Sequence, residues 1–580
     1  MPSTMPSTLY HPELGPLQGY TTPSKKTTEY RNIKYASISS RFQDPLLLSY
    51  APSSTNQIPK NCTTFGPSCP QHPAGFTYDV NLIGEVPEMR QEMNRRKSDS
   101  LSVGSSENDE LECLNLVVAV PEGNFEGSLP VVVWVHGGGF SVGGNSWPQY
   151  DLSNLVSESV GIGKPVIAVS INYRVGLFGF LASSELGLSG NLGLKDQICA
   201  FKWIWKYISG LGGDPERVSA IGESAGSICL STLLHINHSE PLFSKAILMS
   251  GDPTLRRPRD MKWQDSHYQS IITALGLQNL TPKERIEEML TMHPNEIVDK
   301  LPAFMHWSPT IDNTLITDEI TVGNLLDPNH RRGKPEWCKK VIVGSAAHDG
   351  TCLHTRLLAL PLADLLARIH TSLAQTFAPN PNTISLNATT HDPILRILEA
   401  YSLPLPNHVG ELNAQEIYKN ALDLISDLRF NLPSRAMRRG FAERGGRYEF
   451  HQQNPTTNSL FTGMASHELE ISFLFQNYAH FLVTPEARTF VRGMSEVVLG
   501  FVYDEPPATV AQEDESSEGD RERREKEKEK EIIVFGPDYK IKRVEEQEYD
   551  RLYRGCRGAL WDSIGWERWF ELGERVQGCI

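Results

Sequence analysis

The sequence predicts an α/β fold, with a large, mostly parallel central sheet, helices on both of its faces, and long helical insertions. Short apolar runs that suit buried strands recur along the chain. Stretches with helical spacing alternate with these runs from about residue 130 onward. The composition, with 39% hydrophobic and 22% charged residues among 580, is that of an ordinary globular protein and excludes a wholly disordered or fibrous chain.

The strands and helices can be placed in order along the chain. The first strand is expected at 131–135, VVVWV, because five consecutive apolar residues suit a strand that is buried on both faces. A helix is expected within 191–213, since Ile198, Phe201 and Trp205 recur at helical spacing before a pair of glycines. Further strands are expected at 165–174, 217–222, 245–250, 339–345, 446–451 and 532–536, helical insertions at 252–335 and 353–440, and a Trp-rich helix near 561–572.

The outer parts of the chain are expected to be less regular. Residues 1–30 are predicted to be a flexible N-terminal segment, and the polar sequence up to about residue 110, with its Pro and Ser clusters, is predicted to be rich in loops. Residues 31–580 are assigned to one domain. Within it, 511–531 holds ten acidic and six basic residues, which predicts a disordered, solvated loop.

Charge and composition exclude several classes of protein. The net charge of −15 argues against nucleic-acid binding, because no basic excess is available to neutralise phosphates. No apolar run approaches about 18 residues, so no membrane span is expected. The nine cysteines show no zinc-type spacing, and neither a metal nor an organic cofactor is expected. No secretory signal pattern is visible, which favours a cytoplasmic location and leaves secretion open.

The pentapeptide Gly222-Glu223-Ser224-Ala225-Gly226 fits the G-x-S-x-G nucleophile elbow. Such a turn holds a serine in strained backbone geometry above the sheet, and the flanking glycines give the clearance that the turn needs. The pentapeptide lies between a predicted buried strand and a predicted helix, which is the context that the motif requires. The alternative is a Gly-Ser turn without chemistry. We predict that Ser224 is a nucleophile.

A second glycine-rich motif, His136-Gly137-Gly138-Gly139-Phe140, directly follows the strand VVVWV. Successive glycines let backbone N–H groups turn toward a ligand, as in the HGGG oxyanion arm of esterases and lipases. A plain loop and a phosphate-binding loop are the alternatives, but no Lys-Ser/Thr follows and the spacing fits no dinucleotide fingerprint. The expected oxyanion donors are the N–H groups of Gly138, Gly139 and Ala225.

Together these motifs resemble the type-B carboxylesterase/lipase family of α/β-hydrolases, which includes cholinesterases and fungal lipases. Further matching residues are Cys113-Leu114-Asn115-Leu116, Asn172-Tyr173-Arg174 with GLFGFL, GNLGLKDQ (190–197), Gly212-Gly213-Asp214-Pro215 and Met249-Ser250-Gly251. The resemblance covers about residues 30 to 570, is strongest to fungal carboxylesterases, and implies the α/β-hydrolase fold.

The resemblance also implies an acid and a histidine that follow the serine in the chain. The acid is expected at Asp349, which follows a predicted strand and precedes a glycine. The family usually carries Glu at this position, so the shorter side chain must approach its partner more closely. The alternatives are that Asp349 is only a turn residue and that Asp318 or Glu319 is the acid.

The histidine is expected at His467, within GMASHELEISFLF, where it resembles the family's loop histidine. His348, His451 and His480 are its rivals. The role implied for His467 is to accept the Ser224 proton and to return it to the leaving alkoxide.

Cys69 and Cys113 resemble the family's first disulfide, which would stay reduced in a reducing compartment. The segment between them is polar and lacks an amphipathic apolar face. A lipase that acts at lipid surfaces would present an apolar lid, so a soluble small-molecule ester is expected as the substrate in place of triacylglycerol.

The sequence therefore predicts a serine carboxylic ester hydrolase, monomeric or homodimeric, that acts through an acyl-enzyme. A role in fungal secondary metabolism or xenobiotic clearance is a hypothesis that follows from the resemblance. An acyltransferase or thioesterase with the same triad is one alternative, and a non-catalytic cholinesterase-like binding protein is another. Arg256, Arg257 and Arg259 could contact an acidic substrate, although exposed arginines are usually only solvated.

Overall fold

A mixed β-sheet runs through the whole molecule. The computed structural model describes residues 6–50, 58–84, 86–102, 107–330, 332–377, 392–405, 413–505 and 531–578. Within these residues the strands are β1 (Pro6–His11), β2 (Gly15–Thr22), β3 (Thr27–Lys34), β4 (Ala36–Ser37), β5 (Leu46–Leu47), β6 (Lys60–Cys62), β7 (Asn115–Pro121), β8 (Leu129–Val135), β9 (Ile167–Ile171), β10 (Ala182–Ser183), β11 (Leu188–Ser189), β12 (Gly213–Glu223), β13 (Lys245–Met249), β14 (Lys340–Ala346), β15 (Gly445–Phe450), β16 (Ile532–Phe535) and β17 (Ile541–Val544).

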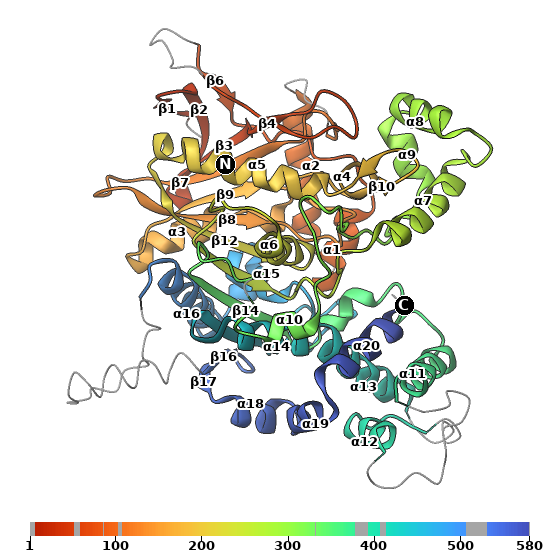
Figure 1. The fold of residues 1–580 in the computed structure, drawn as a ribbon. Helices are drawn as coiled ribbons and strands as arrows, with labels where there is room; N and C mark the ends of the chain where they lie inside the picture. Colours follow the sequence, from red (N-terminus) through yellow and green to blue (C-terminus); the bar gives the residue numbers. More distant parts are fainter. Residues whose placement is uncertain are drawn as a thin grey trace, which may run out of the picture.

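Helices cover both faces of this sheet (Figure 1). They are α1 (Gly75–Ile83), α2 (Pro87–Ser102), α3 (Ser153–Ile162), α4 (Gly176–Phe180), α5 (Leu192–Tyr207), α6 (Ala225–His235), α7 (Met261–Leu275), α8 (Pro282–Thr291), α9 (Pro294–Lys300), α10 (Val322–Leu326), α11 (Leu362–Phe377), α12 (Pro393–Ala400), α13 (Ala414–Ser426), α14 (Leu432–Phe441), α15 (Leu469–Phe475), α16 (Pro485–Val502), α18 (Glu546–Tyr553), α19 (Arg557–Ile564) and α20 (Trp566–Gln577).

The centre of the sheet is parallel. Among the described residues, thirteen strands lie in the order β1-β2-β3-β7-β9-β8-β12-β13-β14-β15-β16-β17, with β6 beside β2. All neighbouring strands from β9 to β16 pair in parallel, whereas the pairs at both ends of this block are antiparallel. The predicted mostly parallel sheet with covering helices is therefore confirmed.

Strand β8 shows why its sequence is a continuous apolar run. Val131, Val133 and Val135 point into the core beneath α5 and α6, while Val132 and Trp134 point into the second core beneath α3, α15 and α16. A strand in a sheet covered on both sides buries alternate residues in different cores, so every position is apolar. Carboxyl ends of parallel strands meet at one edge, and loops that follow β8, β12 and β14 therefore converge.

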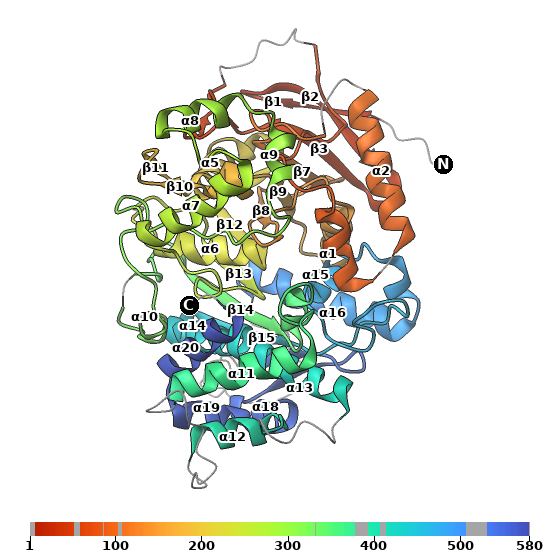
Figure 2. The same cartoon turned by 90° about the vertical axis from the view of Figure 1, so that its right-hand side faces the viewer.

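The N-terminal expectation is wrong. Residues 6–30, predicted to be flexible, form β1, β2 and the start of β3, and these strands extend the sheet at the end opposite to α18–α20, as Figures 1 and 2 show. These strands contain polar residues even at buried positions, such as Thr27, Thr28 and Glu29 of β3, so no apolar run marks them in the sequence. The loop-rich expectation up to about residue 110 also misses α1 and α2.

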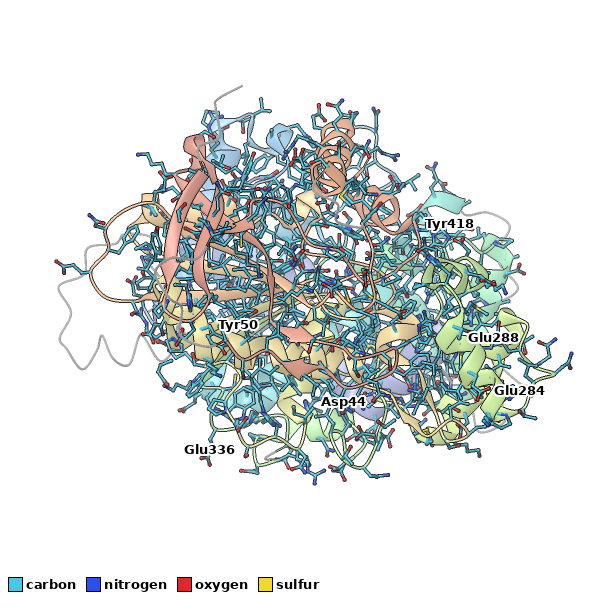
Figure 3. The ribbon with its side chains drawn as sticks, turned by 90° about the horizontal axis from the view of Figure 1, so that it is seen from above. Asp44, Tyr50, Glu284, Glu288, Glu336 and Tyr418 are labelled. Carbon is cyan, nitrogen blue, oxygen red and sulfur yellow. The ribbon has the colours of Figure 1, made fainter. Side chains whose placement is uncertain are left out.

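Several charged side chains lie on the outside of the molecule. Figure 3 shows Asp44, Glu284, Glu288 and Glu336 on the outside of the ribbon, and all four are exposed. Across the described ranges, none of the helices has the length and apolar character needed to cross a membrane. Of the charge run 511–531, only Glu531 lies within the described residues.

Candidate active site

Ser224 stands at the turn between β12 and α6. Its backbone has φ 50° and ψ −120°, a conformation that non-glycine residues rarely adopt and that marks a strained functional turn. The Ser224 N–H donates to the Met249 carbonyl of the neighbouring strand (2.9 Å), and the Ser224 carbonyl accepts from Ile228 in the helix (2.9 Å). The serine side chain is thus held at the sheet edge, at the N-terminus of α6, where a developing negative charge is favoured.

The two glycines of the pentapeptide are required because other backbone atoms lie too close to leave room for a side chain. A Cβ at Gly226 would lie 2.0 Å from the Val135 carbonyl oxygen, and a Cβ at Gly222 would lie 2.6 Å from the Gly226 carbonyl carbon. Both approaches are shorter than any side-chain contact can be. Gly226 therefore lets α6 pack directly against the end of β8, and Gly222 lets the end of β12 lie directly against the first turn of α6.

The loop after β8 carries the predicted oxyanion arm. Gly138 and Gly139 have φ +99° and +60°, and a Cβ at Gly138 would lie 2.2 Å from the Val142 carbonyl oxygen. The Gly138 carbonyl accepts from Ser141 and Val142, which closes a tight turn. Among the described residues, no hydrogen bond uses the N–H of Gly138 or Gly139. Both glycines line the same cavity as Ser224, and Ala225 is the first residue of α6.

Asp349 and His467 meet in the structure. Asp349 begins the short 3₁₀ helix after β14, and its Oδ1 accepts from His467 Nδ1 at 2.7 Å, while its Oδ2 accepts from the Ala346 N–H at 2.8 Å. The His467 N–H is fixed by Thr351 Oγ1 (2.9 Å). Burial raises the pKa of the Asp349 carboxyl, and its hydrogen bond and charge interaction with His467 oppose that rise. The shorter acid does reach the imidazole.

The rival acids and histidines have other partners. Asp318 and Glu319 are exposed and form ion pairs with Arg332 and Arg257. Nδ1 of His348 accepts from the Ala465 N–H, and the Nε2 atoms of His451 and His480 lie at hydrogen-bond distance from Tyr549 Oη and Thr456 Oγ1.

The other nitrogen of His467 faces a glutamate that the sequence analysis did not single out. His467 Nε2 lies 3.0 Å from Glu223 Oε1, and both side chains are buried. Burial, and then the nearby carboxyls of Glu468, Glu470 and Asp79, raise the pKa of Glu223 well above its ordinary value. The only clue to Glu223 in the sequence is its position next to Ser224, because the residue before the nucleophile has its side chain buried in this turn.

Two further buried acids share a network at the edge of the site. Asp79 Oδ2 accepts from Gln149 Nε2 and Tyr150 Oη, both at 2.8 Å, and Tyr150 Oη lies 3.1 Å from Glu468 Oε1. Burial and the neighbouring Asp79 raise the pKa of Glu468 well above its ordinary value. Asp79 lies on α1, far from His467 in sequence, and no local pattern pointed to it.

These elements surround one cavity. Ser224, His467, Gly138 and Gly139 line it together with residues from α1, from the segment after β13 and from the segment after β14. Phe430 closes it beside His467, with the two rings 5.5 Å apart in an edge-on arrangement. Its remaining walls are formed by Tyr78, Asp79, Leu82, Ser141, Ile228, Leu255, Arg256, Phe304, Cys352, Leu353, Arg356, Glu468 and Gln577.

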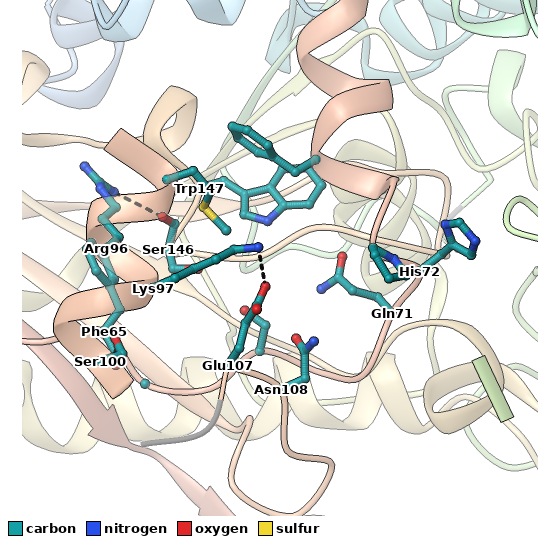
Figure 4. Close-up of a pocket in the computed structure, with 15 residues that line it drawn as sticks. Phe65, Gln71, His72, Arg96, Lys97, Ser100, Glu107, Asn108, Ser146 and Trp147 are labelled. Atoms are coloured by element: carbon teal, nitrogen blue, oxygen red, sulfur yellow. Dashed lines mark hydrogen bonds and ion pairs between the residues drawn. The ribbon is translucent and has the colours of Figure 1, made fainter. Parts of the chain in front are cut away.

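A second pocket lies between α2 and the segment around Gln71 (Figure 4). Its basic side chains are paired with acids, since Lys97 lies 2.5 Å from Glu107 and Arg96 lies 2.6 Å from Asp151. Arg96 also donates to the Ser146 carbonyl (3.2 Å). None of the predicted catalytic residues lines it. In the described part of the chain, no group of three or more His, Cys, Asp or Glu side chains is arranged to hold a metal ion.

Cys69 and Cys113 are free, buried thiols in the structure. The Cys69 thiol lies beside that of Cys113. This contact, together with burial, raises the pKa of Cys113 well above its ordinary value. The structure thus brings the pair together as thiols, and the disulfide stays a prediction.

The three arginines after β13 separate in the structure. Arg256 lines the cavity, whereas Arg257 and Arg259 form ion pairs with the buried Glu574 of α20, at 2.8 and 3.4 Å. Arg356, which the sequence analysis did not mention, lines the cavity beside Arg256.

A serine on a strand-to-helix turn, an acid after a later strand and a histidine on a later loop, all at one edge of a mostly parallel sheet, define the α/β-hydrolase class. The chain belongs to the carboxylesterase family, whose sequence profile matches residues 7–547.

The relatives agree with this membership. The chain is 28% identical to Lipase 3 of Yarrowia lipolytica, over 60% of this chain and 64% of that lipase. It is 29% identical to the para-nitrobenzyl esterase of Bacillus subtilis, over 66% of this chain and 71% of that enzyme. Among solved structures, a PNB esterase shares the fold with a TM-score of 0.67 at 21% identity, over 95% of this chain and 99% of that one.

Proposed function

We propose that this protein is a serine carboxylic ester hydrolase in which Ser224, His467 and Asp349 act together. The observation that carries the proposal is the 2.7 Å contact between Asp349 and His467 at the cavity that Ser224 also lines. Membership of the carboxylesterase family supports the reaction type.

In the proposed reaction, Ser224 Oγ attacks the ester carbonyl while His467 Nε2 accepts its proton. The C–O bond to the alcohol then breaks, and the imidazolium returns the proton to the leaving alkoxide. Water, deprotonated by the same nitrogen, resolves the acyl-enzyme and releases the acid. Asp349 holds the imidazole through Nδ1 and stabilises its charged form.

The developing oxyanion is proposed to bind the N–H groups of Gly138, Gly139 and Ala225. The positive φ angles of the two glycines and the position of Ala225 at the start of α6 support this role. Losing one such donor costs about 10²–10³ in kcat in comparable enzymes.

His467 Nε2 is not hydrogen-bonded to Ser224 in this structure. It faces Glu223 Oε1, and among the described residues it has no hydrogen-bond partner. Catalytic hydrogen bonds are often long or misaligned without substrate and tighten in the complex. We propose that Nε2 turns from the Glu223 carboxyl to Ser224 when the ester binds.

The substrate is proposed to be a soluble small-molecule ester. Within the segment between Cys69 and Cys113, the apolar residues Val80, Leu82 and Met89 are buried, and the exposed positions of α2 are mostly polar, with Leu101 an exception. A lipid surface would therefore meet a mainly polar face. Rates on p-nitrophenyl esters are expected to fall from butyrate to palmitate, and a marked rise on long-chain emulsions would contradict this expectation.

The decisive experiment is labelling with a fluorophosphonate, read by intact mass. One adduct is expected on the parent, and none on Ser224→Ala, which should also lose ester hydrolysis. Ser189→Ala, at an exposed serine outside the cavity, serves as the control and should label normally. Turnover retained in Ser224→Ala would refute the proposal, and a non-catalytic binding protein would give neither adduct nor turnover.

A further inference from the structure

The helix α20 supplies part of the wall of the cavity that holds Ser224. Its residue Gln577 lines that cavity, although it lies far from Ser224 in the sequence. The family profile matches residues 7–547, so α20 lies outside the matched part of the chain. This part of the wall is therefore not accounted for by the motifs of the family.

Two sets of contacts fix the position of α20. Glu574 forms ion pairs with Arg257 and Arg259 of the segment after β13, at 2.8 and 3.4 Å. Leu572 and Val576 are buried in the hydrophobic core that α20 shares with α11, which lies beside it in Figure 2. The helix is therefore held both by buried charge pairs and by apolar packing.

The placement of Gln577 follows from these contacts. Gln577 comes three residues after Glu574, so the two side chains share one face of the helix. Gly578, with φ +77°, ends the helix immediately afterwards. The face of α20 that pairs with Arg257 thus also presents Gln577 to the cavity, which Arg256 lines as well.

Unpartnered polar atoms set two residues apart from the rest of the cavity wall. Of the described side chains that line the cavity, two have a buried polar atom without a hydrogen-bond partner, and these atoms are His467 Nε2 and Gln577 Oε1. The first is the atom proposed to accept the Ser224 proton, so it is left open for the reaction. Buried acceptors without a partner are costly and rare in folded proteins. Gln577 Oε1 therefore requires a donor that the described chain does not supply.

Two hydroxyl groups of the wall show the contrast. Tyr78 Oη donates to the Cys352 carbonyl (2.6 Å), and Ser141 Oγ donates to the Met305 carbonyl (3.3 Å). Their protons are thus used inside the protein and help to fix the shape of the cavity. Gln577 Oε1 has no such role among the described residues, so it is open to a molecule bound in the cavity.

We propose that Gln577 Oε1 accepts a hydrogen bond from an O–H or N–H group of the ester while Ser224 attacks the ester carbonyl. The inference rests on the proposed hydrolase function and narrows its substrate class to esters that carry such a donor. An analogue without the donor is disfavoured, because it leaves the buried acceptor unpaired. Gln577 is thus a specificity-determining residue for the proposed reaction.

The test compares esters of similar shape that differ in this donor. For a donor in the acyl group, p-nitrophenyl 4-hydroxyphenylacetate is compared with p-nitrophenyl 4-methylphenylacetate. For a donor in the alcohol, 4-(hydroxymethyl)phenyl acetate is compared with 4-ethylphenyl acetate. The readout is the ratio of kcat/KM for the hydroxylated ester to that for its alkyl partner, which is independent of the fraction of folded enzyme.

In the parent, this ratio is expected to exceed one in at least one of the two arms. In Gln577→Leu it is expected to fall by about tenfold, because kcat/KM drops for the hydroxylated ester and stays near that of the parent for the alkyl ester. Gln577→Glu keeps an acceptor oxygen and should keep most of the ratio. Gln375→Leu, at an exposed glutamine of α11 outside the cavity, is the matched control, and its ratio should equal that of the parent.

A ratio at or below one in both arms, or a ratio that Gln577→Leu leaves unchanged, would overturn the inference. A ratio that falls equally in Gln577→Glu and Gln577→Leu would also overturn it, since the acceptor oxygen would then not be the determinant. The hydrolase proposal would survive these results if hydrolysis of the alkyl esters still depends on Ser224. Turnover that persists in Ser224→Ala would instead refute the hydrolase proposal itself, so the two failures are distinct.

Discussion

The two sides of the cavity are built in different ways. On one side, Gly138, Gly139 and Ser224 lie on turns that directly follow adjacent parallel strands. Ser224 is fixed by a hydrogen bond to the neighbouring strand, and Gly138 by hydrogen bonds within its own tight turn. On the other side, Tyr78, Arg256 and Arg356 project from α1 and from segments between distant elements. The first side is determined by backbone geometry, and the second by side chains on insertions.

This difference separates two tasks. Backbone donors at a sheet edge cannot change without displacing strands, so they suit a reaction common to many substrates. Side chains on insertions can change while the sheet stays the same, so they suit the selection of one substrate class. Asp349 follows the parallel strand β14, whereas His467 lies on a loop after β15. Both are proposed to serve the first task, and their variants test the comparison most strongly.

The largest effect is expected for Asp349→Asn. The substitution keeps the shape but removes the charge that stabilises the imidazolium, and the same change in the Ser-His-Asp triad of a serine protease lowers kcat by about 10⁴. Steady-state kinetics on p-nitrophenyl butyrate provide the measurement. Asp318→Asn, at an exposed acid, is the control and should stay within a few-fold of the parent.

Asp349→Glu sharpens the same point. It restores the residue usual in the family, but Asp349 already reaches His467 at 2.7 Å and Ala346 at 2.8 Å, so an added methylene must push one contact apart. We expect a milder loss than for Asn. If Asn stays within a few-fold of the parent, Asp349 is not the acid.

A smaller effect on kcat is expected from substitutions in the oxyanion arm, and it should differ between Gly138 and Gly139. A Cβ at Gly138 would meet the Val142 carbonyl at 2.2 Å, whereas a Cβ at Gly139 meets nothing within 4 Å. Gly138→Ala must therefore move the turn, and kcat should fall by about 10²–10³, as when one oxyanion donor is lost.

Gly139→Ala carries only the strain of a positive φ, about 1–2 kcal/mol, and should keep most of the activity. Measuring kcat together with the thermal midpoint separates misplaced donors from lost stability. Equal losses in the two variants would show that backbone clearance does not control the arm.

The smallest effect is expected on the pH dependence of the free energy of unfolding, through Glu470. Burial and the nearby Asp349 raise the pKa of Glu470 to about 7. A carboxyl whose pKa is raised on folding stabilises the fold at low pH, and this contribution is lost as the pH rises from about 4.5 to about 7. For Glu470 it amounts to about 3 kcal/mol at most.

Glu470→Gln should therefore flatten the fall in the thermal midpoint over this pH range. The Ser250 hydroxyl that donates to Glu470 Oε1 (2.5 Å) retains an acceptor in the variant. Glu486→Gln, at an exposed position of α16, is the control. Identical pH profiles for the parent and Glu470→Gln would show that this carboxyl does not titrate with folding.

The central strands and the elbow can be predicted from the sequence alone, because both depend on neighbouring residues. An unbroken apolar run needs only a sheet covered on two sides, and Gly222 and Gly226 flank Ser224 in any strand-to-helix turn of this kind. Asp349 and His467 were located through family resemblance, since their 118-residue separation carries no local signal.

The remaining features depend on tertiary packing. The N-terminal strands, the buried pair of Asp79 and Glu468, and the convergence of Arg256 with Arg356 all depend on segments that meet from distant parts of the chain. Hydrophobic periodicity and motif spacing indicate where a residue lies within its own strand or helix. Which side chains share a cavity is set by how the insertions pack over the sheet.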